Sequence, residues 1–140
     1  MLNLLEYGKK YKLTEKNIKF DGSILYRIEA LKDFGDVKKG DKGGFIEKED
    51  NLSQNGNCWI YDYAMVYGNA QVYEDAQVYE DASVCDNVKV YGKAEVFGYC
   101  WVYEDAEVCD NAIVCGHAKV YRNAKVRGDM VVCNNVEVCS

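Results

Sequence analysis

Residues 64–87 read AMVYGN AQVYED AQVYED ASVCDN, and the same six-residue pattern runs without insertion from Cys58 to Ser140. The third place is Val in every unit except one, which has Ile60, and the first place is Ala in nine of the fourteen units. A short fixed period predicts a solenoid, in which each repeat packs on its neighbours. Because alternate side chains of a strand point to opposite sides, the Ala and Val places are predicted to face inward together.

The last two places of the unit are rich in Gly, Asp, Glu and Asn. Gly, Asn and Asp favour turns and tolerate left-handed backbone, so each unit is predicted to be a short strand followed by a corner. Three units then close one triangular coil, and the fourteen units between positions 58 and 140 make four to five coils. Successive coils are expected to stack as parallel strands about 4.8 Å apart.

Val66 and Ala70, like Val72 and Ala76, place a small residue four positions after an aliphatic one. In this spacing the chain resembles the hexapeptide-repeat family of left-handed parallel β-helices. The resemblance implies an all-β, left-handed parallel β-helix, a triangular solenoid with about 18 residues per coil and four to five regular coils. The left hand comes from the resemblance, since general crossover rules favour the opposite hand.

Residues 1–57 do not follow the period and are predicted to form an N-terminal cap on the repeat domain of residues 58–140, within one globular unit. The Asp21-Gly22 pair separates residues 12–20 from residues 23–31, which favours a β-hairpin. Several glycines between residues 35 and 44 are expected to make tight turns that lead into an irregular first coil. The cap is therefore predicted to be a small hairpin plus that coil.

The net charge of −6 is unevenly placed, because residues 58–110 carry 11 acidic and only two basic residues. Such a surface makes non-specific nucleic-acid binding unfavourable and suits a basic partner. No apolar run is long enough to span a bilayer, and the N-terminus lacks the layout of a signal peptide. We therefore expect a cytoplasmic protein whose seven cysteines are free thiols.

Stacking of whole coils sorts the outward side chains into three faces, of which face A is the most apolar. An exposed apolar patch usually marks an interface, so face A or the open end at Ser140 is predicted to make a homodimer or homotrimer contact. A patch of ordinary surface aromatics, or cover from the cap, is the alternative. The interface residues predicted on face A are Trp59, Tyr61, Tyr79, Phe97, Ile113, Cys115, Val131 and Cys133.

The corners present an acidic surface that does not predict a metal centre. No CxxC motif occurs, and Cys115 and Cys133 stack on one face at a spacing that also suits a disulfide. The acidic residues assigned to this surface are Glu74, Asp75, Glu80, Asp81, Glu104 and Asp105.

The run from Ala30 to Ala70 is similar to the start of uncharacterised β-helix proteins of bacteria and their phages, some of which carry an acetyltransferase label. The sequence and this resemblance leave three functions open. The first is a non-enzymatic, oligomeric binding protein that needs no cofactor. If the protein is phage-encoded, it would act in the host cytoplasm on a bacterial defence complex or its nucleotide signal. The second is an acyltransferase that uses acetyl-CoA, with His117 as the general base. A purely structural or assembly module is a third possibility.

Overall fold

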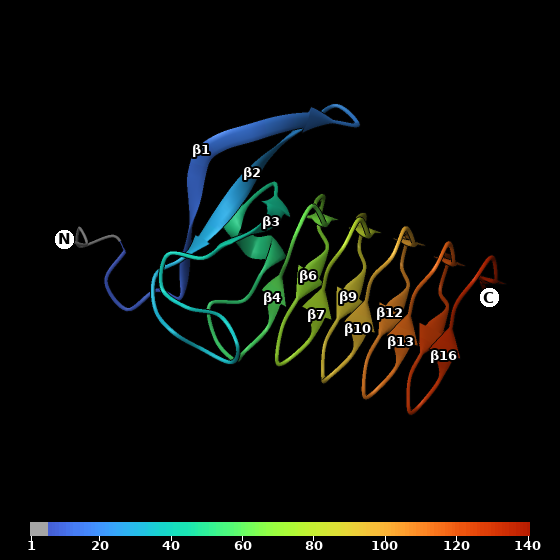
Figure 1. Ribbon diagram of the computed structural model, residues 1–140. Helices are drawn as coiled ribbons and strands as arrows, with labels where there is room; N and C mark the ends of the chain where they lie inside the picture. The colour runs from blue at the N-terminus through green and yellow to red at the C-terminus, as the bar shows by residue number, and fades with distance from the viewer. Residues whose placement is uncertain (1–5) are drawn as a thin grey trace.

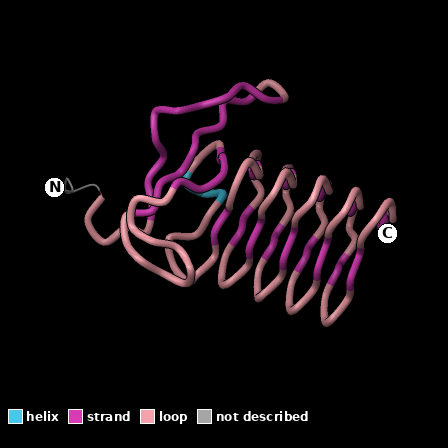
Figure 2. Tube along the Cα trace, viewed as in Figure 1, coloured by secondary structure: helices cyan, strands magenta, loops and turns pink. Residues whose placement is uncertain are grey.

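The computed structural model describes residues 6–140 and shows a β-solenoid of parallel coils with an antiparallel hairpin at its N-terminal end (Figure 1). This confirms the parallel β-helix predicted from the repeat. Figure 2 shows the short strands and loops alternating along each coil. The repeat strands are β4 Trp59–Ile60, β5 Met65–Val66, β6 Gln71–Val72, β7 Gln77–Val78, β8 Ser83–Val84, β9 Lys89–Val90, β10 Glu95–Val96, β11 Trp101–Val102, β12 Glu107–Val108, β13 Ile113–Val114, β14 Lys119–Val120, β15 Lys125–Val126, β16 Val131–Val132 and β17 Glu137–Val138.

The strands form three sheets, one on each side of the coil. Strands β4, β7, β10, β13 and β16 make face A, while β5, β8, β11, β14 and β17 make face B, and β6, β9, β12 and β15 make face C. Register is kept from coil to coil, so Glu95 pairs with both Gln77 and Ile113. Each residue of the repeat therefore lies beside its own counterpart in the next coil.

The core is a column of Val over Val and Ala over Ala. From Ala64 to Val126, every first-place and third-place side chain is buried. Cys58 and Cys100 take the first place as small buried residues, as their position in the repeat predicted. Because the side chains at these two places are small or β-branched, they fill a narrow interior with little void.

The cap consists of β1 Tyr11–Phe20, β2 Ser23–Ala30, β3 Lys42–Ile46 and a 3₁₀ turn at Glu49–Asn51. The β1–β2 hairpin turns at Asp21 and Gly22, as predicted, and β3 pairs with β5 in parallel, which joins the cap to face B. The hairpin extends along the solenoid axis over the first coils (Figure 1). Its Leu25 packs with Phe45, Tyr67 and Cys85 in a second hydrophobic cluster.

Two buried polar side chains of the cap close the first coil. The Asn51 amide accepts hydrogen bonds from the backbone N–H groups of Glu47 and Lys48 and donates to the carbonyls of Gly68 and Ala70. The Lys10 ammonium donates to the carbonyl oxygens of Gly56 and Cys58, at 3.2 and 2.8 Å. Burial lowers the pKa of Lys10, but these acceptors hold the side chain at the end of the coil. Sequence reasoning identified neither residue.

The fifth-place corner residues adopt left-handed backbone, and six of them are acidic, with φ between 57° and 60°. Each of these carboxylates accepts the backbone N–H of its counterpart in the next coil, over 2.8–3.0 Å. The acid thereby satisfies a corner donor that the coil itself leaves free. The six acids are Asp62, Glu74, Glu80, Asp86, Glu104 and Asp110.

Two expectations about face A and the cysteines need correction. Trp59 is only 1% exposed, because Phe34 and Tyr11 of the cap pack against its ring at centroid distances of 5.2 and 6.1 Å. The cap thus covers the beginning of face A, and Trp59 belongs to the core rather than to an interface. Five cysteines are free, but Cys115 and Cys133 form a disulfide across neighbouring coils, with their Cα atoms 4.5 Å apart.

Within residues 6–140, no helix has the length and apolar character needed to cross a membrane.

Candidate ligand-binding site

The tip of the β1–β2 hairpin roofs a hollow of about 380 Å³ on face B. Phe20, the last residue of β1, packs against the rings of Tyr67 and Trp101 at centroid distances of 5.8 and 6.1 Å. Trp101 remains 37% exposed beside the hollow. A volume of this size lies within the usual range for small-ligand sites. The lining residues are Asp21, Tyr67, Cys85, Asp86, Trp101, Tyr103 and Lys119.

The floor of the hollow contains a buried hydroxyl group and a buried thiol. Tyr67 is only 5% exposed, and its hydroxyl lies beside the Cys85 thiol but makes no well-formed hydrogen bond within residues 6–140. Burial raises the pKa of Tyr67, and it raises that of Cys85 to about 11, so both groups are protonated at neutral pH. A buried hydroxyl left unpaired is destabilising by about 1–3 kcal/mol, which a ligand with a hydrogen-bonding group would relieve.

Charges of both signs surround this floor. The carboxylates of Asp21, at the hairpin turn, and Asp86, at a corner, lie close enough to raise the pKa of Cys85 further. Asp86 already accepts the backbone N–H of Glu104, whereas Lys119 brings a cation from the next coil of face B. The arrangement suits a ligand with an apolar or aromatic body and a basic or zwitterionic group.

His117 lies outside this hollow. It is exposed at a corner and stacks on Tyr99, with ring centroids 5.2 Å apart and an interplanar angle of 8°. Its backbone N–H donates to the carbonyl of Asn134. The stacking accounts for an aromatic residue at this corner without an acid–base role.

Several of the remaining predicted face A residues contact one another or the cap. The Tyr61 hydroxyl donates to Asp36 of the cap, and the Tyr79 ring stacks on Phe97 with centroids 4.6 Å apart. Ile113 is partly buried, and Val131 is exposed beside the disulfide of Cys115 and Cys133. The cap therefore covers the beginning of face A, whereas Val131 near its other end is 62% exposed.

The predicted acidic residues divide into two groups. Glu74, Glu80 and Glu104 are fifth-place corner acids bonded to the next coil. Asp75 and Asp105 accept hydrogen bonds from Asn57 and Asn87, whereas the Asp81 side chain has no partner within the described residues. Among residues 6–140, no three His, Cys, Asp or Glu side chains converge to hold a metal ion.

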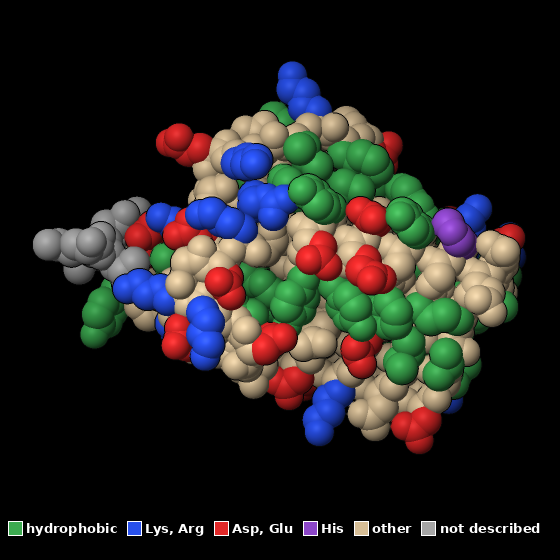
Figure 3. Space-filling model, in the orientation of Figure 1, with side chains coloured by type: hydrophobic (Ala, Val, Ile, Leu, Met, Phe, Trp, Pro, Cys, Tyr) green, Lys and Arg blue, Asp and Glu red, His purple; other side chains and the backbone are tan. Residues whose placement is uncertain are grey.

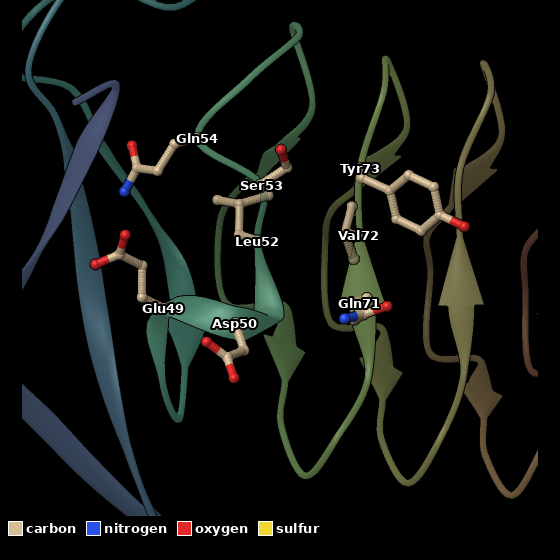
Figure 4. Close-up of a pocket in the computed structure, with 8 residues that line it drawn as sticks. All are labelled: Glu49, Asp50, Leu52, Ser53, Gln54, Gln71, Val72 and Tyr73. Atoms are coloured by element: carbon tan, nitrogen blue, oxygen red, sulfur yellow. The ribbon is translucent and has the colours of Figure 1, made fainter. Parts of the chain in front are cut away.

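A second hollow, of about 370 Å³, lies where the cap meets face C (Figure 4). Its lining comes from the 3₁₀ turn, the segment after it and β6, including Glu49, Gln54 and Tyr73. Glu49 accepts a hydrogen bond from Lys9, and the Gln54 carbonyl oxygen accepts one from the backbone N–H of Lys10. These polar groups are thus engaged in holding the cap, which makes the hollow under the hairpin tip the better candidate for a ligand.

Comparison with known proteins connects the fold to one named relative. No family model matches the chain. A stretch of 62 residues is 45% identical to a protein of Escherichia coli (strain K12) named "Uncharacterized acetyltransferase YdcK". The match covers 39% of this chain and 19% of that protein, so the chain is similar to less than a fifth of its relative. The match and the stacked parallel coils are consistent with the hexapeptide-repeat β-helix family.

Proposed function

We propose that the protein is a non-enzymatic binding protein whose ligand occupies the hollow under the hairpin tip. The buried Tyr67 hydroxyl, which makes no well-formed hydrogen bond within residues 6–140, lies in the same hollow as the partly exposed Trp101, and this pair carries the proposal. Small-ligand sites combine aromatic or apolar side chains with a few polar groups that orient the ligand, and this pair provides one of each. Face B of the repeat domain provides the aromatic side chains of the hollow, and the tip of the β1–β2 hairpin covers it.

Trp101 provides the test, because Trp59 is buried and poorly accessible to quencher. Acrylamide quenching would be measured with tryptamine, spermidine, adenosine and acetyl-CoA as probes, alongside thermal unfolding. At least one probe is expected to protect Trp101 and raise the Tm. Tyr67→Phe should weaken that binding by about fivefold to tenfold, since it removes a single hydrogen-bonding group.

The matched control is Tyr73→Ala on face C, where Tyr73 stacks on Tyr91 outside the hollow. This variant should bind each probe as the unmodified protein does, whereas Trp101→Ala should lose binding. If Trp101→Ala leaves the affinity for every bound probe unchanged, the hollow is not the binding site.

An acyltransferase is the second candidate, because the named relative is called an acetyltransferase. In that case acetyl-CoA should raise the Tm, and His117→Ala should abolish acetyl transfer to an amine or hydroxyl acceptor without lowering acetyl-CoA affinity. Absence of any acetyl-CoA-dependent Tm shift would remove this candidate.

Self-association through the C-terminal half of face A is proposed as the state in which the protein works. The exposed Val131 and the partly buried Ile113 support it, as apolar side chains on a face that the cap does not reach. Val131→Lys should lower the mass measured by light scattering, and an unchanged mass would contradict the contact. Action against a bacterial defence complex or its nucleotide signal stays a prediction, as does a purely structural role.

A further inference from the structure

One corner of the β-helix carries Tyr63, Asp81, Tyr99 and His117, one from each of four successive coils. Tyr63 and Tyr99 are 67% and 59% exposed, so both rings project into solvent. Figure 3 shows His117 in purple at one end of an edge along which acidic side chains (red) lie between hydrophobic ones (green). This edge lies outside the hollow under the hairpin tip.

Within residues 6–140, four pairs of aromatic rings in neighbouring coils are stacked, and the Asp81 corner interrupts one such row. Tyr99 stacks on His117, which lies one coil further on, so the other face of Tyr99 is turned toward the coil of Asp81. Tyr63 and Tyr99 are two coils apart, about 9.6 Å at the usual strand spacing. The short Asp81 side chain leaves room between them for one planar group. The complete rungs have centroid distances of 4.9 Å for Tyr73–Tyr91, 4.6 Å for Tyr79–Phe97 and 5.0 Å for Tyr103–Tyr121.

This slot forms a hollow of about 370 Å³ lined by Asp62, Tyr63, Glu80, Asp81, Gly98 and Tyr99. Two of its three carboxylates are occupied, because Asp62 accepts the backbone N–H of Glu80 and Glu80 accepts that of Gly98, each over 3.0 Å. The carboxylate of Asp81 accepts no hydrogen bond from residues 6–140. Both of its oxygens are therefore available to a donor placed between the two rings.

The molecule already holds one guanidinium group between two aromatic rings. The Arg27 guanidinium carbon lies 4.5 Å from the Phe45 centroid and 5.2 Å from the Tyr63 centroid. Arg27 does not line the slot, which stays open between Tyr63 and Tyr99. A guanidinium group is planar, stacks on aromatic faces and donates two parallel hydrogen bonds to a carboxylate. The slot offers both kinds of contact at once.

We propose that the slot between Tyr63 and Tyr99 binds the guanidinium group of an arginine side chain presented by a basic partner protein, with the Asp81 carboxylate accepting its paired N–H groups. Charge supports this occupant, because residues 58–110 carry 11 acidic and two basic residues, and such a surface attracts a basic partner. Nucleotide phosphates would be repelled by the same carboxylates. This proposal does not depend on the ligand of the hollow under the hairpin tip.

The test uses two blocked peptides, Ac-Gly-Arg-Gly-NH₂ and Ac-Gly-Lys-Gly-NH₂, titrated into the ¹⁵N-labelled protein. The arginine peptide should shift the amide resonances of Tyr63, Asp81 and Tyr99 and bind at least about threefold more tightly than the lysine peptide, which cannot form the paired bonds. Asp81→Asn should weaken arginine binding about tenfold, as should Tyr99→Ala.

The control variant is Asp105→Asn, which removes the same charge from another corner, where Asp105 accepts the Asn87 amide. It should leave arginine binding within about twofold, the change expected from a distant surface charge. Equal losses in Asp81→Asn and Asp105→Asn would overturn the proposal in favour of general charge attraction. Tighter binding of guanosine than of the arginine peptide, with the same amide shifts, would overturn it in favour of a nucleobase site. All the substituted side chains are exposed, and unchanged Tm values confirm that the variants fold.

Discussion

Replacing Asn51 with Ala tests whether a single buried amide holds the cap on the solenoid. The side chain is fully buried and makes four hydrogen bonds to backbone groups, two as acceptor and two as donor. Each bond contributes about 1 kcal/mol net, and each buried partner left unpaired adds a desolvation penalty, so we expect Asn51→Ala to lower the free energy of unfolding by about 3–5 kcal/mol. That is a large share of the roughly 5–15 kcal/mol typical of a domain.

Urea unfolding, followed by circular dichroism, measures this loss. Asn51→Asp keeps both acceptor contacts but turns a carboxylate oxygen toward the carbonyls of Gly68 and Ala70, so it should also be destabilised at pH 7. Protonation of that carboxylate removes the repulsion, so the deficit relative to the unmodified protein should shrink as the pH falls toward 4. Asn87→Ala is the control, because Asn87 is exposed and, among the described residues, its side chain bonds to Asn69 and Asp105 alone. If Asn51→Ala costs less than about 1 kcal/mol, the reasoning from buried hydrogen bonds is wrong.

Three further predictions concern the core, the hairpin and the corners. Burial raises the pKa of Cys100 from 9.0 to about 12, so the unfolded state loses this proton at a lower pH than the folded state does. The free energy of unfolding should therefore fall between pH 9 and 12. In urea unfolding at alkaline pH, Cys100→Ala should reduce the slope of that fall by about 1.4 kcal/mol per pH unit. Phe20→Ala should free the hairpin tip, shift the Trp101 emission to longer wavelength and lower stability by about 1 kcal/mol, and an unchanged spectrum would argue against the contact. Glu104→Ala should be about 1 kcal/mol less stable than Glu104→Gly, because both variants lose the hydrogen bond from the Arg122 backbone N–H but only Gly adopts the left-handed backbone freely. Equal stabilities would show that the backbone at this corner is unstrained.

The repeat could be predicted from the sequence because each residue meets its own counterpart one coil later. The buried Val96 and Ala94 follow directly from that period, as does the stacking of Cys115 on Cys133. The hairpin turn at Asp21 and Gly22 was also predictable, since its signal is local.

The candidate site was not predictable in the same way. The contact of Phe20 with Trp101 joins residues 81 positions apart (101 − 20), and no period relates them. Trp59 was predicted to be an interface residue of face A, with cover from the cap left as an alternative, and the cap does fold Phe34 over Trp59. The corner acids were interpreted as free surface charge, whereas their backbone bonds depend on the left-handed conformation of each corner. Contacts between the non-repeating cap and the repeat domain can be identified only from the three-dimensional structure.

The hairpin spans a fixed number of the coils beside it. Phe20 contacts both Tyr67 and Trp101, which lie 34 positions apart (101 − 67), a span of about two coil repeats. Because every coil is bonded to the next in the same way, evolution can add or delete one whole coil after Glu104 without disturbing the hairpin. The same change between residues 68 and 100 would carry Trp101 away from Phe20. The length of β1 and β2 therefore fixes the number of coils between Tyr67 and Trp101, whereas the number of coils after Glu104 can vary.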